Sequence, residues 1–167
     1  ATGSTSGHPT IMHTFALDYE TYYDKNCSIK TLGTLGYFSH ADFDAYMVSV
    51  VGDEGTEFVG HPKDFDWSLV EPAEWHCTAD LAAYCGLPRS LKNSTAELFD
   101  LDVSKTVRDN MRGKRWDDMS DQFKKDVTAY ALKDSVLCLR LWEALKDNWP
   151  KQEREISVAN RRCSQRG

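Results

Sequence analysis

The sequence FALDYET, at residues 15–21, alternates apolar and polar side chains. Period-two alternation is typical of a β-strand, and we predict a strand from Ile11 to Tyr19. Residues two positions apart on a strand point to the same face of the sheet. Asp18 and Glu20 would therefore direct two carboxylates toward one point near the end of this strand.

Two carboxylates this close resist joint ionisation because like charges repel. A divalent cation between them removes that penalty, and hard oxygen ligands suit Mg²⁺ or Mn²⁺. A pattern as short as Asp-x-Glu also occurs by accident, as solvated charges where a strand ends. Asp18 and Glu20 are thus candidate metal ligands, with a solvated strand end as the alternative.

The chain continues with further strands and then with helices. Residues 28–39 predict a short helix or turn, Tyr46 to Val51 a second strand, and Thr56 to Val59 a third strand after a turn at 52–55. The predicted later elements are a helix from Thr78 to Tyr84, a helix opened by a capping box at Ser94–Glu97, a short basic segment from Lys105 to Gly113, a long helix capped by Ser120 and running to about Asn148, and an amphipathic stretch from Glu153 to Arg162. Strands first and helices after indicate an α+β domain or an α/β domain with a mixed sheet.

The long predicted helix carries a second candidate pair. Tyr130 and Asp134 are four residues apart, so a phenol and a carboxylate lie on one face of the helix. A tyrosine in this position is usually part of a core. Asp134 interrupts an apolar stretch between Leu132 and Val136, and a carboxylate that faces inward usually has a cation or another ligand to satisfy it.

Composition limits the class of protein. The chain has 167 residues, with 41% hydrophobic and 28% charged, which is typical of one globular domain and excludes a disordered chain. No apolar run approaches the roughly 20 residues of a membrane helix, and residues 1–10 resemble a flexible leader rather than a signal peptide. We expect no membrane association.

Cysteine usage and charge add two further expectations. The five cysteines are odd in number and form no Cys-x-x-Cys pair, so a reducing, cytoplasmic location fits. The net charge of −6 does not favour nucleic-acid binding by bulk charge alone. A carboxylate cluster that binds divalent metals offsets part of this charge where a substrate would lie.

Together, these motifs resemble those of a known family, the tyrosine-type DEDD 3′→5′ exonucleases that form the proofreading domains of family A DNA polymerases. Residues 15–24 resemble the first exonuclease motif as bacteriophage polymerases have it, and residues 128–134 resemble the third. Residues 75–81 and 86–92 resemble the strand, helix and loop between these motifs. The resemblance covers about residues 11–167, and its motifs are specific in combination rather than singly.

The resemblance implies an α/β, ribonuclease-H-like fold: a mixed sheet, with its first three strands antiparallel, flanked by helices. It implies that Asp18, Glu20 and Asp134 hold one metal ion and that Asp18 shares a second, the two being Mg²⁺ or Mn²⁺. Tyr130 would orient a water molecule toward the phosphorus. The expected reaction removes nucleoside 5′-monophosphates from the 3′ end of single-stranded DNA.

The same resemblance implies a domain organisation. Residues 11–150 would form the exonuclease domain, and residues 151–167 would begin a helix leading to a polymerase domain in cis. We expect a monomer, located in the host cell cytoplasm if the protein comes from a phage.

The family needs a fourth carboxylate from a middle motif, and this part of the pattern is not evident. Phe65-Asp66 has the right shape, but Pro62 stands where the motif has asparagine. Only eight residues separate Asp66 from Trp75, too few for the helix that should follow. Either Asp66 supplies the carboxylate or the motif is absent, and the spacing favours absence.

A basic run before the long helix is the best candidate for contacting substrate. Its members are Lys105, Arg108, Arg112, Lys114 and Arg115. We predict that Arg112, Lys114 and Arg115 bind phosphates, while Trp116 either stacks on a base or packs on the domain.

Three other functions stay open at this point. The chain could be a free-standing DEDD exoribonuclease, a catalytically weak nucleic-acid-binding module of the same fold, or an α/β domain whose acidic residues bind nothing. Faster cleavage of ribose than of deoxyribose substrates would indicate the exoribonuclease, and DNA binding without turnover would indicate the binding module. The absence of a thermal shift with Mn²⁺ would indicate that the acidic residues bind nothing.

Overall fold

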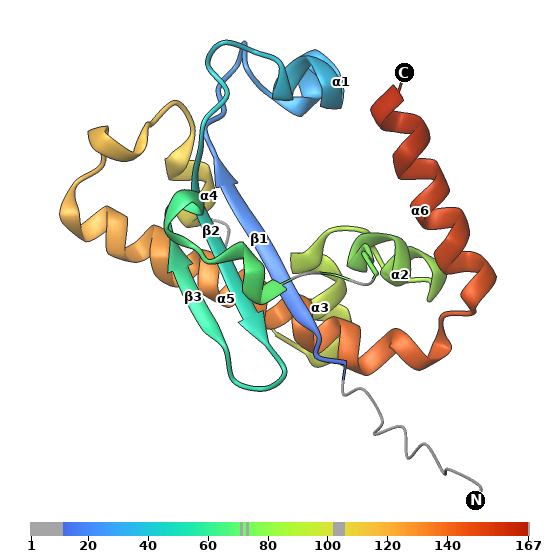
Figure 1. The fold of residues 1–167 in the computed structure, drawn as a ribbon. Coiled ribbons are helices and arrows are strands. Elements are labelled where there is room, and N and C mark those ends of the chain that lie inside the picture. Colours follow the sequence, from blue (N-terminus) through green and yellow to red (C-terminus); the bar gives the residue numbers. More distant parts are fainter. Residues whose placement is uncertain (1–11, 71, 73, 102–105, 167) are drawn as a thin grey trace, which may run out of the picture.

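Three strands form an antiparallel sheet in the order β1–β2–β3 (Figure 1). The computed structural model describes residues 12–70, 72, 74–101 and 106–166, with side chains up to residue 163. The strands are β1 (Phe15–Thr21), β2 (Ala45–Gly52) and β3 (Glu57–Gly60). In the pairing of β1 with β2, Asp18 lies opposite Ser49 and Glu20 opposite Met47. The predicted three-stranded meander is therefore confirmed, and β1 ends just beyond the Asp-x-Glu pair.

The described residues also form six α-helices. They are α1 (Ile29–Phe38), α2 (Thr78–Tyr84), α3 (Leu91–Phe99), α4 (Thr106–Met111), α5 (Asp121–Leu145) and α6 (Lys151–Arg166). Ser120 caps α5 as predicted, since its side chain accepts a hydrogen bond from the Phe123 amide. Gly33 lies inside α1 with φ of 70° and kinks it, which explains why this segment looked like a helix or a turn.

The predicted capping box at Ser94–Glu97 is wrong. Ser94 and Thr95 are buried in the middle of α3, and their hydroxyls donate to the Leu91 carbonyl oxygen one turn earlier. Serine and threonine can satisfy their hydroxyls on the preceding turn as well as at a cap, so the residue types alone could not place the helix start.

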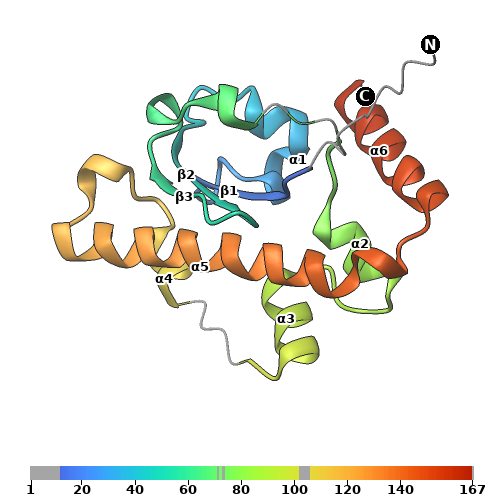
Figure 2. The same ribbon diagram turned by 60° about the horizontal axis from the view of Figure 1, so that its bottom comes forward.

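Helix α5 covers one face of the sheet along its length (Figure 2). Val127 and Ala131 of α5 are fully buried and pack in one cluster with Tyr46 and Met47. Beyond this cluster, the two layers share hydrogen bonds in a buried position. The Ser49 hydroxyl donates to the Ala131 carbonyl oxygen at 2.8 Å and lies 2.6 Å from the Ser135 hydroxyl.

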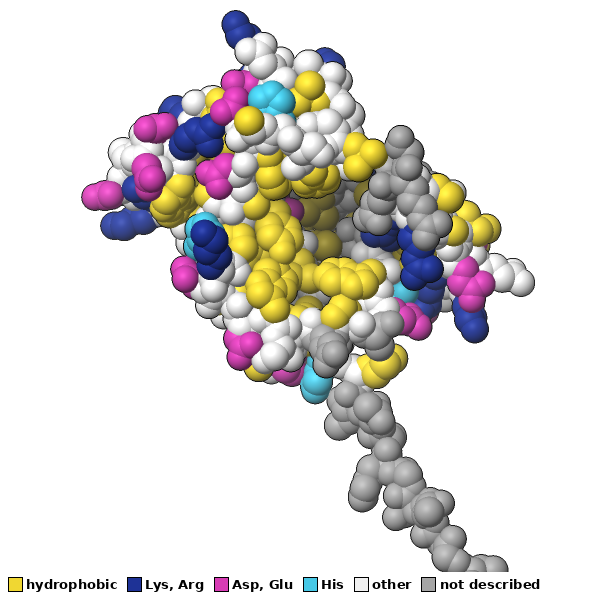
Figure 3. All heavy atoms as spheres, turned by 45° about the horizontal axis from the view of Figure 1, so that its top comes forward, with side chains coloured by type: hydrophobic (Ala, Val, Ile, Leu, Met, Phe, Trp, Pro, Cys, Tyr) yellow, Lys and Arg dark blue, Asp and Glu magenta, His cyan; other side chains and the backbone are white. Residues whose placement is uncertain are grey.

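The opposite face of the sheet has a thinner cover. Phe65 and Val70, from the segment at residues 61–70, pack against Val48 and Val50 of β2. This segment contains only the short 3₁₀ helices η1 (Pro62–Asp64) and η2 (Trp67–Val70). Two further short 3₁₀ helices occur elsewhere, η3 (Trp116–Asp118) and η4 (Lys146–Asn148). Figure 3 shows a face of the molecule on which hydrophobic side chains border a hollow.

The sheet is not mixed, contrary to the expectation. Within the described ranges no fourth strand pairs with β1, which therefore lies at an edge of the sheet. Residues 74–77, where the resemblance places the next strand, have no regular structure. The His76 ring instead stacks on Trp142 of α5, with 4.7 Å between centroids, so this segment packs against the helix rather than beside β1.

Helix α2 packs against the carboxyl-terminal end of α5. Leu81 and Ala82 of α2 form a buried cluster with Leu141, Leu145 and Trp149. Helix α6 follows and contacts α2 through Ser157, whose hydroxyl donates to the Asp80 carboxylate. No helix in the described ranges is long and apolar enough to cross a membrane. Residues 1–10, the predicted leader, lie outside the described residues.

Candidate metal centre and the adjoining hollow

The structure brings Asp18, Glu20 and Asp134 together. Each offers a carboxylate oxygen, and these three oxygens all lie within 4.8 Å of one another. Asp18 and Glu20 share the face of β1 that α5 covers. The buried hydrogen bond between Ser49, opposite Asp18, and Ser135, next to Asp134, fixes how α5 lies along the sheet. The sequence spacing thus correctly placed these side chains on faces that meet.

Glu20 is the most enclosed of the three carboxylates. Its residue is 8% exposed, and its Oε1 atom is buried without a hydrogen-bond partner. Burial, followed by the charges of Asp18 and Asp134, raises the pKa of Glu20 to about 8, against an opposing effect of Arg108. A buried oxygen with no donor is costly unless a cation or a proton satisfies it.

The other two carboxylates respond to the same surroundings. Burial, followed by the charge of Asp134, raises the pKa of Asp18 to about 6. Burial also raises the pKa of Asp134, against opposing effects of Tyr130 and Arg108. Without a cation, the three groups therefore hold protons at a pH where exposed carboxylates have lost them.

Tyr130 joins this group through Asp134. It lies one helical turn before Asp134 on α5, close enough for the two groups to affect each other's pKa. Burial, followed by the effect of Asp134, raises the pKa of Tyr130 well above its ordinary value. The phenol therefore stays protonated near neutral pH and acts as a hydrogen-bond donor, not as a base.

The donor set fits a hard divalent cation. Three carboxylates supply oxygen ligands of the kind that Mg²⁺ and Mn²⁺ prefer. The unpartnered Glu20 oxygen is independent support, because it points to a ligand that the protein itself does not provide. Asp18, Glu20 and Asp134 could therefore hold one ion.

The structure does not bring Asp66 to this group. Phe65 packs on the Val48 and Val50 face of the sheet, opposite to the face that carries Asp18 and Glu20. The Asp66 carboxylate accepts hydrogen bonds from the Ser68 amide and hydroxyl instead. Among the residues that the structure describes, no fourth carboxylate joins the three.

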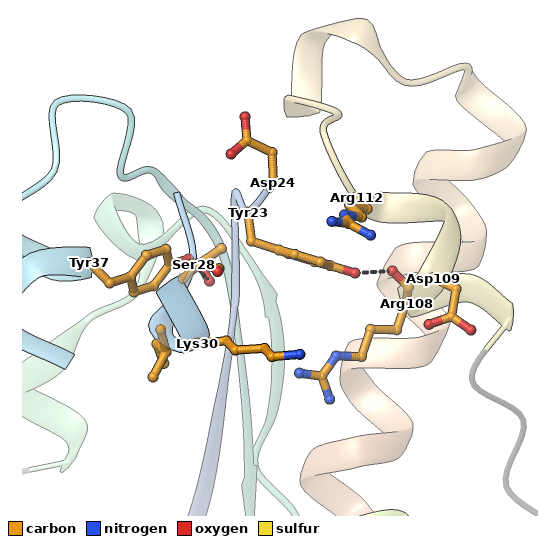
Figure 4. Close-up of a pocket in the computed structure, with 10 residues that line it drawn as sticks. Tyr23, Asp24, Ser28, Lys30, Tyr37, Arg108, Asp109 and Arg112 are labelled. Carbon is orange, nitrogen blue, oxygen red and sulfur yellow. Dashed lines mark hydrogen bonds between the residues drawn. The ribbon is translucent and has the colours of Figure 1, made fainter. Parts of the chain in front are cut away.

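A hollow of about 590 Å³ opens beside the end of β1 (Figure 4). Its lining residues are Thr21, Tyr23, Asp24, Ser28, Ile29, Lys30, Tyr37, Arg108, Asp109 and Arg112. They come from the end of β1, from α1 and from α4. Arg108 lines the hollow and its charge acts on Asp18, Glu20 and Asp134, so the hollow adjoins the carboxylates.

Of the three cations predicted to contact substrate, the structure places only Arg112 in this hollow. Arg115 forms ion pairs with Asp42 at 2.9 Å and Asp44 at 3.9 Å, and Lys114 lies over the Phe123 ring. Trp116 stacks on Tyr46, with 5.9 Å between centroids, so it packs on the domain.

The residues that sequence reasoning missed or ranked low are Lys30 and Arg108. Arg108 belongs to the predicted basic run but had no feature to set it above its neighbours, and Lys105 of the same run lies outside the described residues. Lys30 had no signal at all, because its position depends on how α1 folds back past the end of β1.

Comparisons with protein-family models, with curated proteins and with solved structures returned no match. Any function assigned to the chain therefore has to rest on the geometry of its own residues.

Proposed function

We propose that this chain is a divalent-metal-dependent 3′→5′ exonuclease domain with a ribonuclease-H-like fold, of the tyrosine-type DEDD class. Its substrate would be the 3′ end of single-stranded DNA, and its products nucleoside 5′-monophosphates. A polymerase domain in cis would follow α6 in a longer protein, as the resemblance implies.

One observation carries the proposal: three carboxylates from the first strand and the long helix meet, and a tyrosine lies one helical turn from one of them on the same helix. The order of these elements along the chain supports the same class. An Asp-x-Glu pair lies on the first strand of an antiparallel meander, and a Tyr-x-x-x-Asp pair lies on the helix that packs across it.

The chain's own residues divide the work in this proposal. Asp18, Glu20 and Asp134 hold the cation, which when bound acts as a Lewis acid and lowers the pKa of a coordinated water. Tyr130 donates a hydrogen bond and orients the attacking water, since its phenol keeps its proton. Burial of Glu20 and partial burial of Asp18 and Asp134 reduce screening by water and strengthen their hold on a cation.

The test is degradation of 5′-labelled single-stranded DNA with Mg²⁺ or Mn²⁺. We expect a ladder that shortens from the 3′ end and that a chelator abolishes. Asp134→Asn should lower the rate by at least about 100-fold. Asp126→Asn is the matched control, because Asp126 is an exposed carboxylate on the same helix. Absence of a ladder from the wild-type chain would contradict the proposed activity.

A second variant separates orientation from metal binding. Tyr130→Phe keeps the ring and removes the hydroxyl, so we expect a rate loss of about 100-fold with an unchanged thermal shift on adding Mn²⁺. A parallel RNA substrate tests the exoribonuclease alternative, which predicts faster cleavage of ribose than of deoxyribose.

The lack of a fourth described carboxylate favours a second candidate, a nucleic-acid-binding module of weak activity. A second ion would be poorly held by three carboxylates, and chemistry that needs both ions would slow by orders of magnitude. DNA binding with a Mn²⁺-dependent thermal shift but no ladder would select this candidate.

A further inference from the structure

Cations from two helices converge in the hollow beside the carboxylates. Lys30 comes from α1, Arg108 comes from α4, and Arg112 directly follows α4. Figure 4 shows the Lys30 ammonium and the Arg108 guanidinium pointing toward one another. Neither forms an ion pair with any residue that the structure describes, so these two like charges face each other with no directly paired carboxylate.

The two carboxylates that line the hollow do not neutralise this pair. Asp24 accepts hydrogen bonds from the amides of Asn26 and Cys27 and from the Tyr22 hydroxyl. Asp109 points away from the gap between Lys30 and Arg108 in Figure 4. The gap therefore lacks the anion that would stabilise two cations at this spacing.

The walls of the hollow are held by hydrogen bonds between distant parts of the chain. The Tyr23 hydroxyl donates to the Arg108 carbonyl oxygen at 2.5 Å, which ties α4 to the end of β1. The Tyr37 hydroxyl contacts Thr21 at 2.7 Å and the Tyr22 carbonyl oxygen at 2.6 Å, which ties α1 to the same strand end. Lys30 and Arg108 thus extend from anchored helices.

Arg108 also lies close enough to the carboxylates for its charge to act on them. Burial dominates the raised pKa values of Asp18, Glu20 and Asp134, and the charge of Arg108 opposes that rise in all three. Arg108 therefore lines the hollow and also acts electrostatically on the three carboxylates.

We propose that Lys30 and Arg108 form a phosphate subsite, which holds a phosphate group of a nucleotide beside the carboxylates. This inference rests on the proposed function for its nucleotide ligand. The phosphate has two sources, an internal phosphodiester of the bound strand or the phosphate of a nucleoside 5′-monophosphate. Arg112, on the wall of the same hollow, adds positive charge at its rim.

The test measures binding without divalent metal, at low salt, so that it does not depend on turnover. The probes are a fluorescently labelled oligothymidylate and thymidine 5′-monophosphate, the latter as a competitor. The variants are Lys30→Gln and Arg108→Gln. Lys63→Gln is the matched control, an exposed lysine in the segment that covers the opposite face of the sheet. Lys30 and Arg108 are also exposed, so unfolding of the variants is not expected.

We expect each variant to weaken oligothymidylate binding about fivefold and to reduce its salt dependence by about 0.7 in the log–log slope. If the monophosphate loses affinity in parallel, the subsite takes a terminal phosphate; if only the oligonucleotide does, it takes an internal phosphodiester. Both outcomes support the subsite.

Three outcomes would overturn it: no binding of either probe by the wild type, unchanged binding in both variants, or an equal loss in Lys63→Gln. The activity of the wild-type chain is measured separately with Mn²⁺. A chain that binds the probes through Lys30 and Arg108 but cleaves nothing retains the subsite and loses the proposed exonuclease function. If both variants cleave DNA at the wild-type rate, the proposed exonuclease function is retained and the phosphate subsite is contradicted.

Discussion

The two faces of β1 contrast sharply in what covers them. Asp18 and Glu20 lie on the face covered by α5, a helix of 25 residues that shares buried hydrogen bonds with β2. Tyr19 lies on the other face, 45% exposed, and stacks on Trp67, which is itself 38% exposed. The polar pair is thus on the better-covered face, the reverse of what burial of apolar surface alone would give.

The face under α5 combines packing that stabilises the fold with carboxylates that destabilise it. Apolar contacts and the Ser49–Ser135 hydrogen bond hold α5 against the sheet firmly enough to keep carboxylates buried there. Those carboxylates oppose folding when ionised, so they persist only because the surrounding packing is strong. The opposite face carries no such groups and is held by short 3₁₀ turns.

The largest expected effect compares one core residue from each face. Met47→Ala removes a side chain 3% exposed beneath α5 and should lower the free energy of unfolding by about 3 kcal/mol. Trp67→Ala removes a ring that is 38% exposed, stacks on Tyr19, meets Phe65 edge-on and donates to the Pro62 carbonyl oxygen, and it should cost about 1 kcal/mol. Urea unfolding at constant m-value measures both. Equal losses would mean that the two covers are equally strong.

The next effect concerns pH. Glu20 titrates near 4.5 in an unfolded chain but about 8 in the folded one, and Asp18 near 3.8 but about 6. The folded state therefore holds more protons across these windows, so stability without metal falls as pH rises from about 4 to 8 and then levels. We expect the thermal midpoint to drop on the order of 5 °C between pH 5 and 8.

Glu20→Gln sharpens this prediction, because it removes the group with the widest window. The variant should be more stable than the wild type at pH 8 without metal, and Mn²⁺ should raise its thermal midpoint much less. Glu57→Gln, an exposed glutamate on β3, is the control and should follow the wild-type profile. A Glu20→Gln profile with the full wild-type slope would contradict the assignment of the pH dependence to this carboxylate.

Local sequence patterns predicted part of the candidate site, whereas the packing between distant segments could not be predicted. Period-two alternation placed Asp18 and Glu20 on one face, and helical spacing placed Tyr130 above Asp134, because both patterns are local. That these faces meet follows from packing between β2 and α5, which the sequence only suggested through an aspartate in an apolar stretch. The place of Lys30 in the hollow and the stacking of His76 on Trp142 depend on segments distant in the sequence, so neither the hollow nor the missing fourth strand could be predicted.

A smaller effect compares one hydroxyl from each face. Ser135→Ala removes a buried hydroxyl that bonds both the hydroxyl and the carbonyl oxygen of Ser49, and should cost about 1 kcal/mol. Ser68→Ala removes an exposed hydroxyl that bonds Asp66, and should cost less than about 0.5 kcal/mol. Thermal unfolding of the two variants side by side checks the order, and the reverse order would show that the Ser49–Ser135 contact does not hold α5 in place.

The smallest expected effect is that of Arg115→Gln. Arg115 was a predicted phosphate ligand, but its guanidinium pairs with Asp42 and lies over the Tyr22 ring at 4.4 Å. A cation already paired offers little net charge to a phosphate, and an exposed ion pair contributes about 0.2–1 kcal/mol to stability. Arg115→Gln should therefore change oligothymidylate affinity less than twofold, against the about fivefold loss expected for Arg108→Gln. Fluorescence anisotropy on both variants decides the matter, since a larger loss in Arg115→Gln would move the phosphate contacts out of the hollow and onto the loop after α4.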